Sequence, residues 1–300
     1  MTQLSPPGTQ GAADRRRGRL YILGAATLWS AGGFITKRLE MDPLSIAFYR
    51  SLFAGLALLP LVPRSKLVFR PSLLPLGLAF GAMTGLYLTS VKLTSAANAI
   101  FLQCTATLWT VPIGLILLRE RPSRREMAGI AMAMVGIITI VAWGRAEGNI
   151  RPRDGEGILL GLTSGIAYAA VVVGLRALRD LDPLWTSAAG NLVAAATLGA
   201  WLLLTAGAIT VPTPGQVPVL VAFGAIQLAI PYVLFARGLR TIHAPEAALL
   251  GLLEPVLSPI WVILFVGEYP ELATVVGGVF LLAGVAVRYL PARRATLPSE

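Results

Sequence analysis

Long apolar runs alternate with short polar segments along the whole chain, and this pattern predicts a membrane protein built from helices. A helix of about 20 apolar residues spans the ~30 Å hydrocarbon core of a bilayer. Proline falls at or near the start of several runs, for example Pro43, Pro183 and Pro270, where its missing N–H costs least. We therefore predict ten transmembrane helices, over about residues 19–38, 43–63, 71–91, 95–118, 125–143, 157–177, 183–206, 216–238, 244–266 and 271–290.

One stretch of the chain, Lys92–Pro122, is followed much later by a second copy, Arg240–Pro270. Each copy is an apolar run that ends in a Glu-x-Pro sequence, and the register continues without a gap into spaced glycines. Apolar matches mean little in so apolar a chain, so the evidence for a duplication rests on charged, proline and glycine matches. These matches are Lys92 with Arg240, Glu120 with Glu268, Pro122 with Pro270, Gly129 with Gly277 and Gly136 with Gly284.

The duplication predicts two halves of five helices each. Because five is an odd number, the second half enters the membrane from the opposite side. The predicted fold is an all-α integral membrane protein with two inverted five-helix repeats around a central cavity, an arrangement used for alternating access. The expected regions are a disordered cytoplasmic N-terminus at 1–18, the repeats at 19–143 and 157–290, a linker at 144–156 and a cytoplasmic tail at 291–300.

Composition and charge agree with a membrane protein. Only 13% of the residues are charged, whereas a soluble domain has roughly 25%. The net charge of +10 alone suggests nucleic-acid binding, but the Lys and Arg residues lie in short loops, mostly on the N-terminal side of the predicted membrane. This bias places both termini in the cytoplasm of a bacterial-type inner membrane. Because the first apolar run continues to Ile35, we expect an uncleaved span rather than a signal peptide.

Several chemical classes are excluded by what the chain lacks. Cys104 is the only cysteine and His243 the only histidine, so an internal disulfide and a multi-histidine metal site are both excluded. The chain has no GxxxxGK[ST] sequence, so ATP does not drive its activity through a P-loop. We expect no cofactor, no metal and no nucleic-acid partner, and the sequence leaves the oligomeric state open.

The order of the motifs resembles that of a known family. The first half carries a W…K…P…R pattern, and both halves carry E-x-P followed by spaced glycines; the first pattern is Trp29, Lys37, Pro43 and Arg50. In this respect residues 19–290 resemble the drug/metabolite transporter superfamily, EamA type. The resemblance implies a transporter that exports amino acids and related metabolites or imports small solutes. Within that group the chain is similar to YddG-like exporters of aromatic amino acids.

Glu254 is the most unusual residue in the predicted spans, because it lies about ten residues into the ninth one. A charged side chain at the bilayer centre costs ~2.5–3.5 kcal/mol on insertion scales, so it should face a cavity or a partner. We favour a contact with a substrate amine or a proton-coupling site. The alternative is a protonated or hydrogen-bonded packing residue beside Pro255.

Two further groups, Glu246 and His243, lie near the cytoplasmic start of the same span. Glu246 and Glu254 are eight residues apart, so on a continuous helix they share one face, about 12 Å apart along the axis. A proton path through His243, Glu246 and Glu254 is therefore one interpretation. We favour the alternative for Glu246 and His243, which is capping of the helix start.

Four more side chains are expected to line the cavity with Glu254. Trp109 is predicted near mid-depth, away from the interfacial aromatic belts, where its ring can stack on a substrate. Tyr87 and Tyr168 combine an apolar ring with a hydroxyl group, which suits amphipathic solutes. Gln227 precedes Pro231 in a helix expected to bend, and bent helices expose backbone groups at mid-membrane. For each residue, ordinary packing is the alternative.

The remaining charged residues are expected to have architectural roles. Lys37 and Arg50 should reach the outer interface or pair with Asp42 or Glu40. Glu120 and Glu268 should hold loop geometry or pair with nearby arginines such as Arg124. Gly129, Gly136, Gly277 and Gly284 have the spacing of a packing stripe on the fifth and tenth helices.

Together these features predict a secondary transporter or facilitator that exports amino acids, aromatic and other apolar ones, by alternating access. The partners are then the lipid bilayer and a small-molecule substrate. Export would run on the substrate gradient, or on protons if Glu254 titrates. The alternatives are a transporter of another small metabolite or drug, an integral-membrane lipid-modifying enzyme, and a scaffold or receptor. The inverted duplication favours a transporter, because it serves access from two sides.

Overall fold

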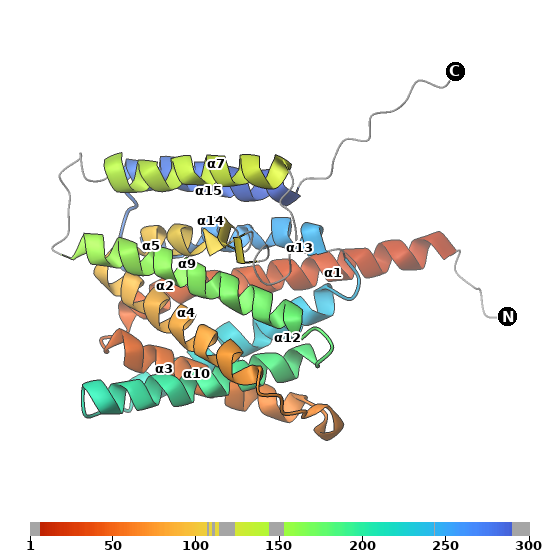
Figure 1. Cartoon of the computed structure of the whole chain (residues 1–300), viewed down its shortest axis with the longest axis horizontal. Coiled ribbons are helices and arrows are strands. Elements are labelled where there is room, and N and C mark those ends of the chain that lie inside the picture. Colours follow the sequence, from red (N-terminus) through yellow and green to blue (C-terminus); the bar gives the residue numbers. More distant parts are fainter. Residues whose placement is uncertain are drawn as a thin grey trace, which may run out of the picture.

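The structure is a computed structural model, and every regular element in the part of the chain that it describes is a helix (Figure 1). It describes residues 7–106, 108–109, 112–113, 124–143, 153–242 and 244–289. The α-helices are α1 (Pro7–Ser30), α2 (Gly32–Arg38), α3 (Pro43–Leu58), α4 (Leu73–Leu93), α5 (Ala96–Gln103), α7 (Arg124–Ile138), α9 (Asp154–Ala177), α10 (Pro183–Thr205), α11 (Gln216–Gly224), α12 (Ile230–Gly238), α13 (Ala244–Gly251), α14 (Leu253–Val266) and α15 (Leu272–Tyr289). Short 3₁₀ turns cover Leu59–Leu61 and Arg64–Lys66, and π-helical segments cover Thr139–Trp143 and Ala225–Ala229.

The chain is a multi-pass membrane protein. Within the described residues, six helical segments are long and apolar enough to cross a bilayer: Pro43–Leu61, Leu73–Leu93, Asp154–Ala177, Pro183–Thr205, Gln216–Gly238 and Leu249–Val266. Shorter apolar helices cover Met127–Trp143 and Leu272–Val287. All of these coincide with predicted spans. The N-terminal helix differs, because α1 begins at Pro7, within the segment for which the sequence predicted disorder. Its alanine and arginine residues favour helix and extend the first span outward.

Several spans are interrupted within the described residues, and the sequence explains three of these interruptions. The first breaks at Ala31, before the helix-weakening pair Gly32-Gly33. The eighth passes through the π-helical segment Ala225–Ala229, where Pro231 cannot donate to the residue four positions back. The ninth breaks between α13 and α14 at Leu252. Here Pro255 has no N–H to donate to the carbonyl of Gly251, which interrupts the helical hydrogen bonds.

Helices from both halves of the chain pack side by side. α4 lies along α9, α3 along α10 and α1 along α12, while α7 and α15 form a separate pair along one side of the molecule (Figure 1). A Cβ on Gly136 would meet the backbone of Gly277, and one on Gly284 would meet Gly129. The predicted glycine stripe is therefore the contact surface between the fifth and tenth spans.

The two ends of the helix bundle are held differently. At the end where α1 begins, which we call the Arg19 end, Arg19 pairs with Glu246 and Arg70 with Asp180, at N–O distances of 2.5 Å. The side chains of both pairs are largely exposed, between 32% and 55%. At the opposite end, which we call the Lys37 end, Lys37 pairs with Glu268 at 3.0 Å, and these side chains are only 12% and 13% exposed.

Candidate functional site

Arg50 lies in the middle of α3 with only 7% of its surface exposed. Its Nη2 donates a hydrogen bond to Oε1 of Gln227 over 3.0 Å, and its guanidinium carbon lies 4.7 Å from the centre of the Phe223 ring. The prediction that Arg50 reaches the outer interface or pairs with Asp42 or Glu40 is therefore wrong. It fails because α11 and the adjoining π-helical segment place an amide and an aromatic face beside the guanidinium at mid-helix.

Gln227 positions this arginine. It lies in the π-helical segment Ala225–Ala229 and is 4% exposed. Its Nε2 donates to the backbone oxygen of Trp29 over 2.8 Å, directly before the break between α1 and α2. Because both ends of the amide are satisfied, Gln227 links two interrupted spans and fixes the orientation of Arg50.

Glu254 brings a negative charge to the same region from the start of α14. Arg50 and Glu254 interact electrostatically with each other, and both act on Tyr87 of α4 and Tyr232 of α12. Glu254 is only partly buried. We call Arg50, Tyr87, Gln227, Tyr232 and Glu254 the Arg50 site.

Aromatic rings line one side of this site. The ring of Trp29 meets that of Tyr232 edge-on at 5.6 Å between centroids, and it lies 5.5 Å from Phe235. Phe80 contacts Tyr232 edge-on at 6.3 Å. The arrangement combines two opposite charges with apolar ring surfaces, which is the lining expected for an amphipathic solute.

The structure brings together three of the five residues predicted to bind substrate, namely Tyr87, Gln227 and Glu254. Trp109 is partly buried, and its indole N–H is buried without a partner among the described residues. Tyr168 lies on α9 with 37% of its surface exposed and takes no part in the contacts of the Arg50 site described above. The sequence did not lead us to predict Arg50 or Tyr232 as site residues. Tyr232 could have been found from its position directly after Pro231, in the same span as Gln227.

The predicted proton path is not a continuous helix face. Glu246 lies in the first turn of α13 and Glu254 in the first turn of α14, and the break at Leu252 removes the shared register. Glu246 also accepts a hydrogen bond from Nε of Arg19 over 2.5 Å. His243 lies outside the described residues. Glu246 therefore holds α1 against α13 at the Arg19 end.

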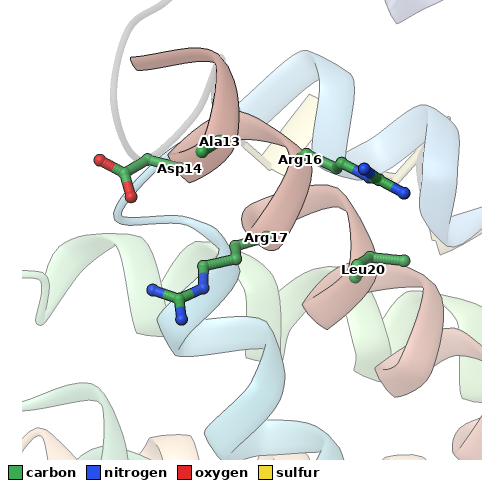
Figure 2. A pocket seen from close by; sticks show the side chains of 5 residues that line it. All are labelled: Ala13, Asp14, Arg16, Arg17 and Leu20. Atoms are coloured by element: carbon green, nitrogen blue, oxygen red, sulfur yellow. The ribbon is translucent and has the colours of Figure 1, made fainter. Parts of the chain in front are cut away.

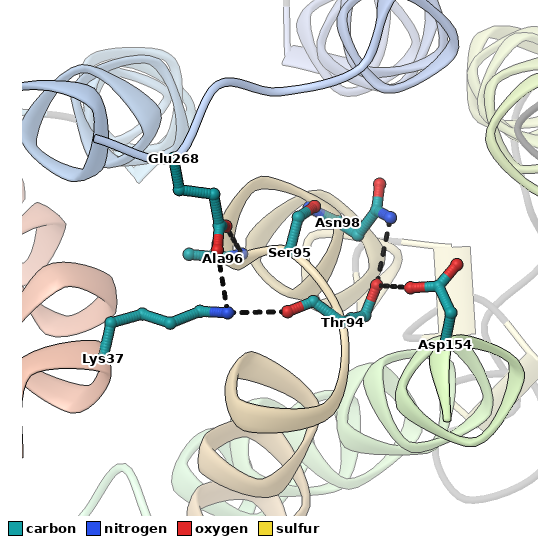
Figure 3. Close-up of polar contacts among 7 residues, drawn as sticks. All are labelled: Lys37, Thr94, Ser95, Ala96, Asn98, Asp154 and Glu268. Atoms are coloured by element: carbon teal, nitrogen blue, oxygen red, sulfur yellow. Dashed lines mark hydrogen bonds and ion pairs between the residues drawn. The ribbon is translucent and has the colours of Figure 1, made fainter. Parts of the chain in front are cut away.

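A polar network closes the Lys37 end (Figure 3). Nζ of Lys37 bonds to the carboxylate of Glu268 and donates to the backbone oxygen of Thr94 over 2.8 Å. The same carboxylate accepts a 2.8 Å hydrogen bond from the backbone N–H of Ala96, at the start of α5. Lys37 therefore pairs with Glu268, not with Asp42 or Glu40 as predicted. Asp42 instead caps α3 by accepting from Ser45 N over 2.7 Å.

The network extends into the second half of the chain. The hydroxyl of Thr94 bonds to the carboxylate of Asp154 in α9 and accepts from Nδ2 of Asn98 over 3.1 Å (Figure 3). Oδ1 of Asn98 accepts from the hydroxyl of Thr274 in α15 over 2.6 Å. Hydrogen bonds and one ion pair thus join α2, α5, α9 and α15 at this end, through Thr94 and Glu268 in the connecting segments.

Two surface hollows are present among the described residues, and the second borders the Arg50 site at Gln227. One, of about 400 Å³, lies along the N-terminal part of α1 beside Asp14, Arg16 and Arg17 (Figure 2). The other, of about 440 Å³, is an apolar groove between the break of the first span and α11, and Gln227 forms part of its lining. The charged residues of Figure 2 belong to a single helix and contact none of the Arg50 site. The described residues contain no cluster of His, Cys, Asp or Glu that could hold a metal ion.

Comparisons with known proteins agree on a family. Residues 16–142 and 155–290 match the model of the EamA-like transporter family. An uncharacterized transporter of Archaeoglobus fulgidus is 28% identical over 91% of this chain and 97% of its own length. The uncharacterized transporter YwfM of Bacillus subtilis is 24% identical over 89% of this chain and 92% of its own length. A protein of known crystal structure shares the fold with a TM-score of 0.67 and 21% identity, over 93% of this chain and 99% of the other.

Proposed function

Because the chain belongs to the EamA-like transporter family, we propose that it is a secondary transporter that exports amino acids, aromatic and other apolar ones. Membership makes the chain a multi-pass membrane transporter of a small molecule and not an enzyme. The amino-acid substrate and the direction are the proposal. The likeness of its aromatic-lined spans to those of YddG-like exporters supports both.

The Arg50 site is the observation that carries this proposal. Buried ionisable groups within membrane spans are costly, so they mark substrate or ion pathways. Here the cation Arg50 and the anion Glu254 come from different spans. The rings of Trp29, Tyr87 and Tyr232 lie in the same region. A free amino acid has two opposite charges and one side chain, and an apolar side chain suits the ring surfaces.

Transport by alternating access follows from the proposed arrangement of the chain. In it, residues 19–143 and 157–290 are two inverted five-helix repeats that rock about a central site, with both termini in the cytoplasm of the inner membrane. The Arg19 end then faces the cytoplasm and the Lys37 end faces outward. The substrate gradient drives export, and protons contribute where Glu254 changes charge during the cycle.

Flux through purified protein tests the proposal. Liposomes that contain the full chain should move labelled phenylalanine and leucine faster than empty liposomes. The same vesicles with and without an imposed pH gradient separate proton coupling from facilitated diffusion. Glu254→Gln should abolish any dependence on that gradient; a dependence that survives this substitution rejects Glu254 as the coupling group. If a sugar, a cation or a drug is transported and no amino acid is, the assignment of amino acids as the substrate is wrong.

A further inference from the structure

Arg50 and Glu254 are two opposite charges that do not neutralise each other directly. Among the residues that the structure describes, no ion pair joins them, although they interact electrostatically. Nε of Arg50 is buried and has no hydrogen-bond partner. Burial removes the water that would otherwise accept a hydrogen bond from this N–H. The guanidinium is therefore left with an unsatisfied donor.

Glu254 is the opposite charge of the site. Its carboxylate interacts electrostatically with Arg50, Tyr87, Tyr232 and Cys104, but no hydrogen-bond donor among the described residues reaches it. The residue is partly exposed. A donor that reaches the carboxylate would bond to it, and a cationic donor would also compensate its charge.

Resting on the proposed function, we propose that the substrate is held as a zwitterion, with its carboxylate on Arg50 and its ammonium group on Glu254. Guanidinium groups match carboxylates in shape and charge, and Gln227 already holds this one in place. Tyr87 and Tyr232 interact electrostatically with both charges and add hydroxyl groups to the same region. Each charge of the substrate thereby satisfies one buried charge of the protein.

This assignment makes both charged groups of the substrate necessary for recognition. An amino-acid amide keeps the ammonium group but leaves Arg50 without its acceptor. An N-acetyl amino acid keeps the carboxylate but leaves Glu254 without its donor. Leaving a buried charge unpaired reduces affinity roughly tenfold or more, because the site then loses a charge-assisted hydrogen bond.

Competition in proteoliposomes tests the assignment. Exchange of labelled phenylalanine is measured against unlabelled phenylalanine, phenylalanine amide and N-acetylphenylalanine. With the wild-type chain, phenylalanine should compete at least roughly tenfold more strongly than either analogue. Arg50→Gln should remove its advantage over the amide, and Glu254→Gln its advantage over the N-acetyl compound. Arg153→Gln and Glu156→Gln, in an exposed pair away from the site, should keep the wild-type ranking.

Each outcome decides the assignment. Analogues that compete with the wild-type chain as well as phenylalanine does would overturn it while amino-acid transport stands. So would variants that weaken all three competitors equally. If Arg50→Gln does not insert, Arg50→Lys keeps the charge without the forked geometry and should compress the ranking between phenylalanine and its amide; an unchanged ranking overturns the assignment. Wild-type vesicles that exchange no amino acid overturn the proposed function and the zwitterion with it.

Discussion

At the residue scale, the position of Arg50 depends on one amide. Gln227 accepts from Arg50 in a buried bond and donates to the backbone oxygen of Trp29 in a partly buried one. The sequence predicted Glu254 because acidic residues inside apolar spans are rare, and Gln227 because it precedes Pro231 in a helix expected to bend. It did not predict the depth of Arg50, because an arginine eight residues into a span can extend to either interface or bind a partner from another helix. Only the packing of α3 against α11 decides this.

Gln227→Leu should therefore reduce both stability and transport. It removes the acceptor of a buried guanidinium, which costs about 1–3 kcal/mol in the free energy of unfolding. Gln227→Glu should retain more of the stability, because a carboxylate can pair with Arg50, yet it should slow transport by competing with the substrate carboxylate. Thermal unfolding in detergent and phenylalanine exchange measure the two effects. Gln216→Leu is the comparison: it removes hydrogen bonds with Thr213 and Glu40, but these are exposed to water, so it should alter stability and transport less than Gln227→Leu. Equal losses in all three variants would contradict the prediction.

At the element scale, apolar length and proline positions were enough to predict the spans, whereas the partners of each helix were not predictable in general. The fifth and tenth spans are the exception. Their glycines recur at matched positions, and the structure places the two glycine faces in contact. The polar network at the Lys37 end was not predicted, because its members come from four helices and the segments between them, and each residue alone has an ordinary role at a helix end.

Gly277→Ala should separate α7 from α15. A Cβ at this position would meet Ile140 and the backbone oxygen of Gly136, and overpacking of this kind costs about 1–3 kcal/mol. Gly215→Ala is a matched control, since nothing lies within 4 Å of a Cβ at that position. Thermal unfolding should show a loss for Gly277→Ala only. The competition ranking of substrates should be the same in both variants, because this helix pair lies apart from the Arg50 site.

At the scale of the whole molecule, the two ends differ in how strongly they are closed. Exposed ion pairs such as Arg19–Glu246 and Arg70–Asp180 contribute about 0–1 kcal/mol each. Breaking the mostly buried pair Lys37–Glu268 by removing one partner costs more, with fully buried pairs reaching about 3–5 kcal/mol. The separation of helices at the Arg19 end therefore requires less free energy than at the Lys37 end, and the resting protein should open more often at the Arg19 end.

Cys104 reports which end opens, because it is the only cysteine and interacts electrostatically with Glu254 at the Arg50 site. A membrane-impermeant thiol reagent, applied to vesicles sorted by a tag on the N-terminus, should label Cys104 faster from the Arg19 end than from the Lys37 end. Lys37→Met should raise the labelling rate from the Lys37 end, because Glu268 then loses its buried cation. Arg153→Met removes an exposed pair and should leave the rate unchanged. Equal rates from both ends in the wild-type protein, or no response to Lys37→Met, would show that the buried network does not set the resting conformation.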